Sequence, residues 1–186
     1  MRKLSVFNSV SVDGYFTDAK GDMTFAHRDD PEMDAFASEN ASGEGALVFG
    51  RVTYDLMVGF WPTAEAKAAM PTVADGMNRY PKLVFSRTLQ EATWANTELV
   101  RDDPADVMRA RKREAGPDMV ILGSGTIVSQ LTEARLIDEY QLAVIPIVLG
   151  GGRTLFEGVS GNPNLELVST RRFDSGAVLL VYRPAT

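Results

Sequence analysis

Short apolar runs that end in a glycine or a small polar residue recur along most of the chain. Three of them, at residues 46–50, 82–85 and 119–122, predict buried strands, and segments with helical spacing follow the first and the third. Residues 3–12 predict a further, largely buried strand that ends at the turn pair Asp13-Gly14. Strands that alternate with helices in this way favour an α/β fold with a mostly parallel sheet.

The C-terminal part of the chain has a different pattern. Residues 141–149 predict an apolar strand, and Pro146 inside it indicates a sheet edge or a bulge. Two later runs, at residues 165–167 and 177–182, flank Asp174-Ser175-Gly176 and predict an antiparallel hairpin. No linker-like stretch divides the chain. We therefore predict a single domain over residues 1–186 with an α/β fold: about eight strands in a mixed, mostly parallel sheet flanked by helices.

Prolines set the predicted helix boundaries. Asp30-Pro31 and Asp103-Pro104 each combine an N-cap residue with a proline suited to the first helical turn, and the second of these helices is predicted to reach Arg113. Residues 64–80 predict two short helices, because Pro71 lies inside this segment. Residues 15–28 predict a loop of the kind that often covers an active site.

The composition excludes several kinds of site. The absence of cysteine excludes disulfides and cysteine-based zinc sites, and the single histidine, His27, excludes a centre with several histidine ligands, so we predict no metal. The net charge of -6 argues against nucleic acid or an anionic membrane surface as a partner. The sequence has neither a signal-peptide core nor an apolar run long enough to span a bilayer, and we expect a cytoplasmic protein.

Two junctions between a strand, a glycine and a helix carry the candidate chemistry. The strand at 119–122 runs into Gly123-Ser124-Gly125, and the free N–H groups and positive dipole of the following helix favour an anion. A tight turn between packed elements would give the same pattern, and the missing third glycine makes the dinucleotide fingerprint weak. The junction at Gly50 adds the cation Arg51 and the hydroxyl Thr53, which suit a diphosphate better than a bare turn does.

Two other stretches have an ordinary and a functional interpretation. Ser86-Arg87 follows the strand at 82–85, so it is either a solvated loop or a hydroxyl and a cation at a strand end. Phe60-Trp61-Pro62 follows Gly59 and must leave the preceding helix. A Phe-Trp pair most often packs in a core, yet on a loop between glycine and proline it equally suits the wall of a ligand cleft.

Six short motifs occur in order along nearly the whole chain. They are Ser11-Val12-Asp13-Gly14-Tyr15, Gly50-Arg51-Val52-Thr53-Tyr54, Phe60-Trp61-Pro62, Lys82 to Leu89, Leu122-Gly123-Ser124-Gly125, and Ile145 to Phe156. Together they resemble the dihydrofolate reductase-like family, and more closely its branch that contains the riboflavin-biosynthesis reductase domain and many small stand-alone reductases. The resemblance implies a mixed sheet flanked by helices, and NADPH as the cofactor.

Carried over by motif, the resemblance implies NADPH-binding residues in several parts of the chain. On the diphosphate and adenosine side these are Gly50, Arg51, Thr53, Ser86 and Arg87, the last two at the ribose and its 2′-phosphate. The pyrophosphate cradle is Gly123, Ser124, Gly125 and Thr126. Near the nicotinamide lie Ser9, Ser11 and Phe16. Two arginines on the adenosine side lead us to expect NADP to be preferred over NAD.

One departure from the family concerns the substrate. Dihydrofolate reductases place an acidic residue in the helix after the first loop to hold the pteridine. Here Asp30, Glu32 and Asp34 are all candidates for that role. Folate is therefore not the substrate that we favour.

We expect a reductase that transfers hydride from NADPH to a small polar C=O or C=N compound, riboflavin-precursor-like or pterin-like. The compound would bind against Asp13, Trp61 and the turn at residues 150–156. Asp13 is the candidate proton donor, and forming the turn before Gly14 is its alternative role.

Two further expectations concern turnover and assembly. A catalytically inactive nucleotide-binding or interaction module on the same fold is the alternative to an enzyme, because a fold alone does not establish turnover. We also expect a homodimer. The family often pairs through its C-terminal strands, and the apolar run from Leu142 to Leu149 exceeds what one small sheet face needs to bury.

Overall fold

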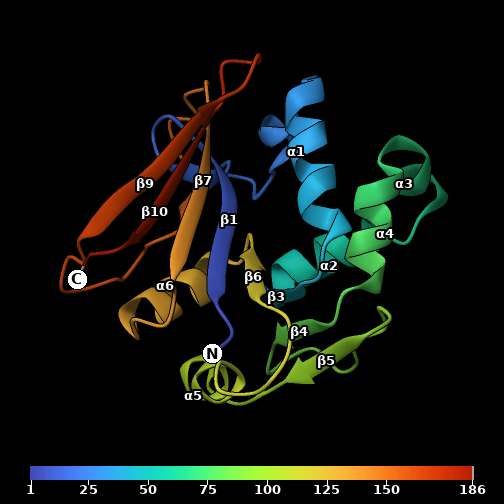
Figure 1. The fold of residues 1–186 in the computed structure, drawn as a ribbon, viewed down its shortest axis with the longest axis vertical. Helices are drawn as coiled ribbons and strands as arrows, with labels where there is room; N and C mark the ends of the chain where they lie inside the picture. Colours follow the sequence, from blue (N-terminus) through green and yellow to red (C-terminus); the bar gives the residue numbers. More distant parts are fainter. Residues whose placement is uncertain (186) are drawn as a thin grey trace.

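A computed structural model describes residues 1–185 and contains an eight-stranded sheet with strand order β5-β4-β3-β6-β1-β7-β10-β9 (Figure 1). The parallel strands are β1 (Leu4–Ser11), β3 (Ala46–Gly50), β4 (Lys82–Phe85), β5 (Thr97–Val100), β6 (Met119–Leu122) and β7 (Glu139–Ile145). β10 (Val178–Pro184) pairs antiparallel with β7 and with β9 (Leu165–Arg172). The predicted mixed, mostly parallel sheet with an antiparallel C-terminal hairpin is confirmed.

β1 lies in the middle of the sheet, between β6 and β7. Its side chains alternate between the two faces, and Leu4, Val6 and Val10 share one buried face. From β3 the chain moves outward to β5, returns at β6, and then crosses to β7 on the other side of β1. Ligands of open α/β sheets bind outside the carboxyl ends of the strands at such a switch point, so the ends of β1, β3 and β6 are the expected site.

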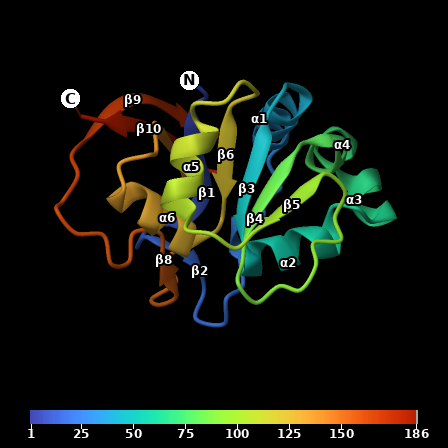
Figure 2. The same cartoon turned by 90° about the horizontal axis from the view of Figure 1, so that it is seen from below.

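Helices cover both faces of the sheet. They are α1 (Pro31–Ser42), α2 (Arg51–Phe60), α3 (Ala64–Ala69), α4 (Pro71–Arg79), α5 (Pro104–Arg111) and α6 (Gly125–Glu133). Met108 of α5 and Val128 of α6 pack on the face of β3 that holds Val48, whereas Met77 of α4 packs with Phe49 on the opposite face. In both Figure 1 and Figure 2, α5 and α6 accordingly lie apart from α1, α3 and α4.

The predicted helix starts are confirmed, and their caps have the expected geometry. The Asp30 carboxylate accepts hydrogen bonds from the N–H groups of Glu32 and Met33 at the start of α1. Asp103 caps α5 in the same way, although α5 ends at Arg111 and not at Arg113. Pro71 starts α4 directly after α3, as its position predicts.

Two predicted segments differ from the structure. The strand predicted at 141–149 is β7, which ends at Ile145, because Pro146 has no N–H to continue the ladder. The predicted loop at 15–28 contains the short strand β2 (Tyr15–Thr17) and a 3-10 turn (Thr24–Ala26). β2 pairs with β8 (Arg153–Thr154) to form a two-stranded ribbon, the β2–β8 ribbon, which places Phe16 and Leu155 on the α6 side of the core.

The outer strand β9 is open to solvent. Among its apolar side chains, Leu167 is 55% exposed and Val168 is 46% exposed, although in a strand they point to opposite faces. A register shift between Val181 and Tyr182 interrupts the pairing of β10 with β9. No helix among residues 1–185 combines the length and the apolar character that crossing a membrane requires.

Candidate functional site

The two glycine junctions predicted from the sequence meet at the carboxyl ends of β3 and β6. The backbone N–H of Ser124 donates to the Thr53 hydroxyl at 2.9 Å, and the backbone N–H of Gly50 donates to the Ser124 hydroxyl, also at 2.9 Å. The Ser124 hydroxyl in turn donates to the Leu122 carbonyl. Both hydroxyl side chains are buried. Hydrogen bonds therefore fix the start of α2 against the start of α6.

The glycines of the second junction are required by packing inside the protein. Gly123 has a φ of +56°, and a Cβ there would lie 2.7 Å from the Thr53 hydroxyl oxygen. A Cβ at Gly125 would lie 2.7 Å from the Phe16 ring. Ser124 between them has a φ of 58°, which is uncommon for a residue with a side chain. The turn is thus shaped by its own neighbours, whatever ligand it meets.

Both helix starts keep features that favour an anion. Neither α2 nor α6 has a side chain that caps its N-terminus. The first N–H groups of each helix and the positive ends of two dipoles therefore lie close together. Arg51 is exposed at the first position of α2, and its one carboxylate partner, Asp55, lies 3.4 Å away on the same exposed surface. A surface pair of this kind holds the guanidinium only weakly.

The β2–β8 ribbon lies over the start of α6. Phe16 is 4% exposed and packs against Gly125. From β8, the Arg153 guanidinium donates to the Thr126 hydroxyl at 3.3 Å. Sequence reasoning missed Arg153, whose only signal was its position directly after three glycines.

Asp13 anchors the turn that leads into this ribbon. Its carboxylate accepts hydrogen bonds from the backbone N–H groups of Leu149 (3.1 Å) and Gly150 (2.7 Å). Hydrogen bonding from Ser11, followed by these backbone bonds, lowers the pKa of Asp13 to about 2. The group is therefore ionised at neutral pH and carries no proton to donate. Its catalytic role stays a prediction, and the geometry favours an anchoring part.

Trp61 lies at the other end of α2. It follows the last residue of that helix, about 15 Å along the axis from Arg51. Its ring packs edge-on against Phe60 with 5.2 Å between the centroids, and its indole N–H points to the Met57 sulfur. The structure thus separates Trp61 from the two glycine junctions, and a contact with substrate stays a prediction.

The predicted adenosine-side residues follow β4, which pairs with β3. The Ser86 hydroxyl accepts hydrogen bonds from the N–H groups of Thr88 and Leu89, so it shapes the turn after the strand. Arg87 is exposed, and its only hydrogen bond as a side-chain donor within residues 1–185 is a long one of 3.4 Å to the Arg101 carbonyl. This guanidinium is available to a ligand.

Ser9, Ser11 and the neighbouring Asn8 lie near the end of β1. Ser9 and Ser11 lie on one side of the strand, and Ser11 is buried with its hydroxyl accepting the Tyr15 N–H. Asn8 points to the other side, where its amide donates to the Gly123 carbonyl at 3.1 Å. Its side-chain oxygen is buried and has no partner among the described residues. Sequence reasoning missed Asn8, which has no motif signal.

The acidic residues considered for a pteridine are engaged or exposed. Asp30 is buried and, besides capping α1, accepts the Ser175 N–H at 2.8 Å from the C-terminal hairpin. Hydrogen bonds from the Ser175 hydroxyl and backbone lower the pKa of Asp30. Glu32 pairs with Arg171 at 2.9 Å, and Asp34 is exposed. No buried free carboxylate results from these three residues.

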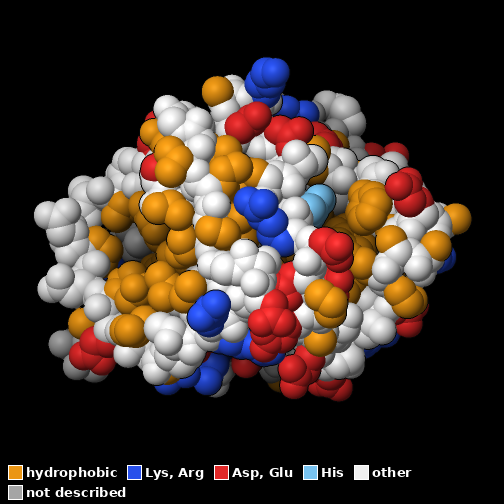
Figure 3. Space-filling view, turned by 90° about the horizontal axis from the view of Figure 1, so that it is seen from above, with side chains coloured by type: hydrophobic (Ala, Val, Ile, Leu, Met, Phe, Trp, Pro, Cys, Tyr) orange, Lys and Arg blue, Asp and Glu red, His pale blue; other side chains and the backbone are white. Residues whose placement is uncertain are grey.

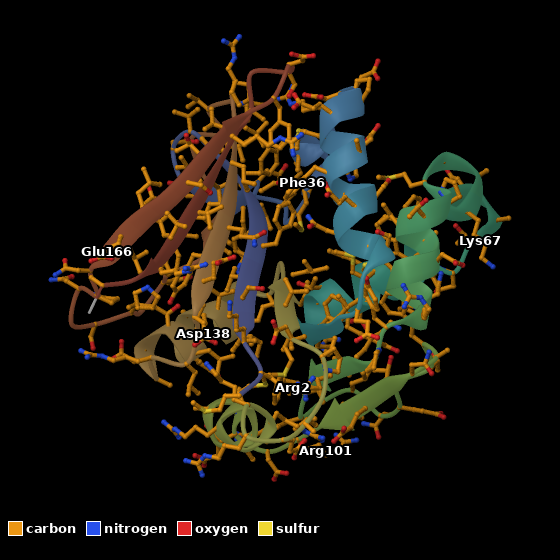
Figure 4. All side chains as sticks on the ribbon, viewed as in Figure 1. Arg2, Phe36, Lys67, Arg101, Asp138 and Glu166 are labelled. Carbon is orange, nitrogen blue, oxygen red and sulfur yellow. The ribbon has the colours of Figure 1, made fainter. Side chains whose placement is uncertain are left out.

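An aromatic cluster fills the space between α1 and the sheet. Phe36 of α1 lies 6.0 Å from Phe7 of β1 and 5.9 Å from Phe173 of the hairpin, measured between ring centroids. Figure 4 labels Phe36 at the inner side of α1, facing the sheet. Arg171 covers the Phe36 and Phe173 rings from the outside. Figure 3, which looks onto the end toward which β1 runs, shows basic side chains in the middle of that face, acidic ones beside them and apolar patches on both sides.

This arrangement is the dihydrofolate reductase-like fold. The chain matches dihydrofolate reductase from Enterococcus faecalis, complexed with NADP(H), with a TM-score of 0.65 at 15% identity, over 99% of this chain and 97% of that one. It also matches a putative riboflavin biosynthesis protein from Shewanella sp. PV-4 with a TM-score of 0.75 at 21% identity, over 99% of both chains.

Within this fold class the chain belongs to the RibD C-terminal domain family, whose model matches residues 2–179. Its curated relatives include the uncharacterized protein YyaP from Bacillus subtilis (strain 168), which is 27% identical over 181 residues, or 97% of this chain and 94% of the relative. The predicted family is confirmed, and the protein is related to reductases.

Proposed function

We propose that this protein is an NADPH-dependent reductase of a small polar C=O or C=N compound. The observation that carries the proposal is the pair of uncapped helix starts, α2 and α6, which Ser124 and Thr53 fasten together beside Arg51. Arg87, in the turn after the neighbouring strand β4, adds a second available cation. A diphosphate and a ribose 2′-phosphate are the anions that such a row of donors suits.

The residues of the chain would bind and orient the cofactor, and NADPH would supply the hydride. Backbone N–H groups after Gly50 and around Gly125 would hold the diphosphate, while Ser86 and Arg87 would hold the adenosine ribose with its 2′-phosphate. Ser9 and Ser11 would lie near the nicotinamide. The buried oxygen of Asn8, which has no partner within residues 1–185, is one polar atom that a bound group or a water would satisfy.

The engaged acidic residues favour a riboflavin-precursor-like compound over dihydrofolate. Because Asp30 caps α1 and holds Ser175, it is not free to bind a pteridine. Phe7, Phe36 and Phe173 pack with one another in the space between α1 and the sheet, so a compound smaller than a folate is the one that we favour. Asp13, ionised at neutral pH, would position the 149–150 turn.

The test is a titration of the protein with NADPH, followed by NADPH oxidation with a panel of carbonyl and imine compounds. Dihydrofolate and a ribitylamino pyrimidine are the first substrates to compare. We expect oxidation that depends on substrate, faster with the pyrimidine. Tight NADPH binding without turnover across a broad panel would favour the inactive module, and no binding of NADPH would overturn the proposal.

We also propose that two copies pair through β9. Its exposed Leu167 and Val168 lie on an edge strand whose backbone is unpaired on one side within residues 1–185. We expect sedimentation to give a dimer at micromolar concentration and Leu167→Lys to give a monomer. A wild-type protein that sediments as a monomer would remove this proposal.

A further inference from the structure

We propose that Arg153 is the cation that closes the diphosphate cradle, and that the β2–β8 ribbon serves to position it. This inference rests on the proposed cofactor and gives a cofactor-binding role to a residue that the sequence analysis placed only within the substrate-facing turn at 150–156. Arg153 would be a binding residue, and Asp13, which acts on it through the 149–150 turn, a positioning residue.

The electrostatics of Arg153 point to a missing anion. Its guanidinium is held at the second residue of α6 by one long hydrogen bond, 3.3 Å, to the neutral Thr126 hydroxyl. It forms no ion pair with any carboxylate of residues 1–185. A cation beside the positive end of a helix dipole is unfavourable. An anion bound between the guanidinium and the helix N–H groups would be attracted both by the arginine and by the helix dipole.

A second group at the same turn lacks a partner. Asn8 is 2% exposed, and its amide donates to the Gly123 carbonyl two residues before α6. Its side-chain oxygen is buried without a hydrogen bond within the described chain. An amide oxygen accepts hydrogen bonds, so a donor such as a water, and not the diphosphate itself, would satisfy this atom beside the turn.

Three sets of contacts fix the backbone of the ribbon around Arg153. Tyr15 pairs with Thr154 and Thr17 pairs with Arg153 across the two strands. Phe16 packs against Gly125, which fixes the ribbon to α6. The Asp13 carboxylate accepts the N–H groups of Leu149 and Gly150, which fixes the start of the turn before β8. A guanidinium on so constrained a backbone is prepared for a ligand at one position.

The predicted ligand group is the diphosphate, and this makes Arg153 different from Arg87. The diphosphate is common to NADPH, NADH and ADP-ribose, whereas only NADPH among them has the 2′-phosphate. Arg153 therefore contributes to the affinity for all three ligands, and Arg87 to the affinity for NADPH alone. Charge-assisted hydrogen bonds to phosphate are among the stronger ones in proteins.

The experiment measures dissociation constants by calorimetry for NADPH, NADH, ADP-ribose and 2′-AMP, without any substrate. We expect Arg153→Gln to weaken the first three about tenfold each and to leave 2′-AMP, which has no diphosphate, unchanged. Arg153→Lys should recover part of the loss, since it keeps the charge without the planar fork. The matched control is Arg113→Gln, an exposed arginine beyond α5, which should change no constant.

Each other outcome overturns the inference. Unchanged constants for Arg153→Gln would show that the guanidinium does not meet the cofactor. A loss confined to NADPH would move Arg153 to the 2′-phosphate. If the wild-type protein binds none of these ligands, the proposed function itself fails, which is a distinct result.

A second variant tests whether Asp13 positions Arg153. Asp13→Asn should weaken the binding of the three diphosphate ligands as much as Arg153→Gln does, and it should have no further effect when Arg153→Gln is already present.

Discussion

The two ends of the central sheet contain the same kinds of charged side chain in opposite states. At the amino ends of the strands, Lys82 is surrounded by carbonyls and Lys112 is paired with Asp138; Figure 4 labels Asp138 near the start of β1. At the carboxyl ends, within the described part of the chain, the Arg87 side chain donates only to a carbonyl and the Arg153 side chain only to a hydroxyl. Most lysines and arginines of residues 1–185 form no ion pair, so the two ends differ in burial and in the number of hydrogen-bond acceptors around each cation. The comparison teaches that cations buried among several acceptors hold the fold, whereas Arg87 and Arg153, each exposed with one long hydrogen bond, are available to a ligand.

Lys82 shows how completely the amino end satisfies a cation. The side chain is 2% exposed, and its Nζ donates to the carbonyls of Asn78, Tyr80 and Ala95 at 3.2, 2.7 and 3.1 Å. It also lies 4.5 Å from the centroid of the Trp94 ring. This ammonium joins the end of α4 to the loop before β5 without any carboxylate.

Lys82→Met should have the largest effect and should act on stability alone. Removing the ammonium leaves buried carbonyls without their donor, so we expect the free energy of unfolding to fall by about 2–4 kcal/mol. Urea denaturation measures this loss. The dissociation constant of NADPH for the folded variant should not change, and a weaker constant would break the division between the two ends.

The second prediction uses pH to separate the two ends. Burial lowers the pKa of Lys82 from 10.5 to about 8, so between these pH values the unfolded chain binds more protons than the folded one. Stability should therefore rise with pH through this window, by up to about 3 kcal/mol relative to the Lys82→Met variant. The carbonyls around Lys82 and the Trp94 ring stabilise the charged ammonium, so they reduce this gain in stability. NADPH affinity should stay flat, because Lys82 lies at the amino ends of the strands and the proposed cofactor residues lie at the carboxyl ends. Parallel stability curves for the two proteins would contradict the prediction.

Arg87→Ala is the corresponding change at the carboxyl end. The variant should bind NADPH about 10- to 100-fold more weakly, or about 1.4–2.7 kcal/mol, and bind NADH as before. The free energy of unfolding should stay within about 0.5 kcal/mol of wild type, because the side chain is exposed. Equal losses for both cofactors would place Arg87 at the diphosphate, and a wild-type preference for NADH would remove the assignment.

The smallest expected effect is that of an exposed ion pair on α5 that takes part in neither group of contacts. Arg109 and Asp106 lie three residues apart on α5, with side chains 48% and 77% exposed. Arg109→Gln should change the free energy of unfolding by less than about 0.5 kcal/mol and leave cofactor binding unaltered. A larger loss of stability would show that pairing alone, without burial, is enough to make a charge structural.

Local sequence patterns predicted the helices and strands well. They did not predict the contacts between elements that are distant in sequence. Pro31, Pro71 and Pro104 fixed helix starts because a proline acts on its own backbone and on the residue before it. The contact of Ser124 with Thr53 joins residues 71 positions apart, and only the sheet order brings them together.

Physical reasons explain why no local pattern marks the residues that sequence reasoning missed. Arg153 lies on a two-residue strand, too short for any period to appear, and its pairing with β2 spans most of the chain. Lys82 has the pattern of an ordinary strand start, because its acceptors are backbone carbonyls that every residue type possesses. The sequence predicts Asp30 as a helix cap, and the structure confirms it. Its further hydrogen bond, from the Ser175 N–H, depends on where the hairpin lies in the fold.

The central position of β1 also has a consequence for synthesis on the ribosome. β1 emerges first, yet its two neighbours start at Met119 and Glu139, so both of its edges remain without partners while most of the chain is made. Unpaired strand edges of this kind are prone to aggregation, and long-range parallel pairing is slow. β1 therefore gains its partners only after Met119 and Glu139 have been synthesised, so its pairing depends on the last third of the chain.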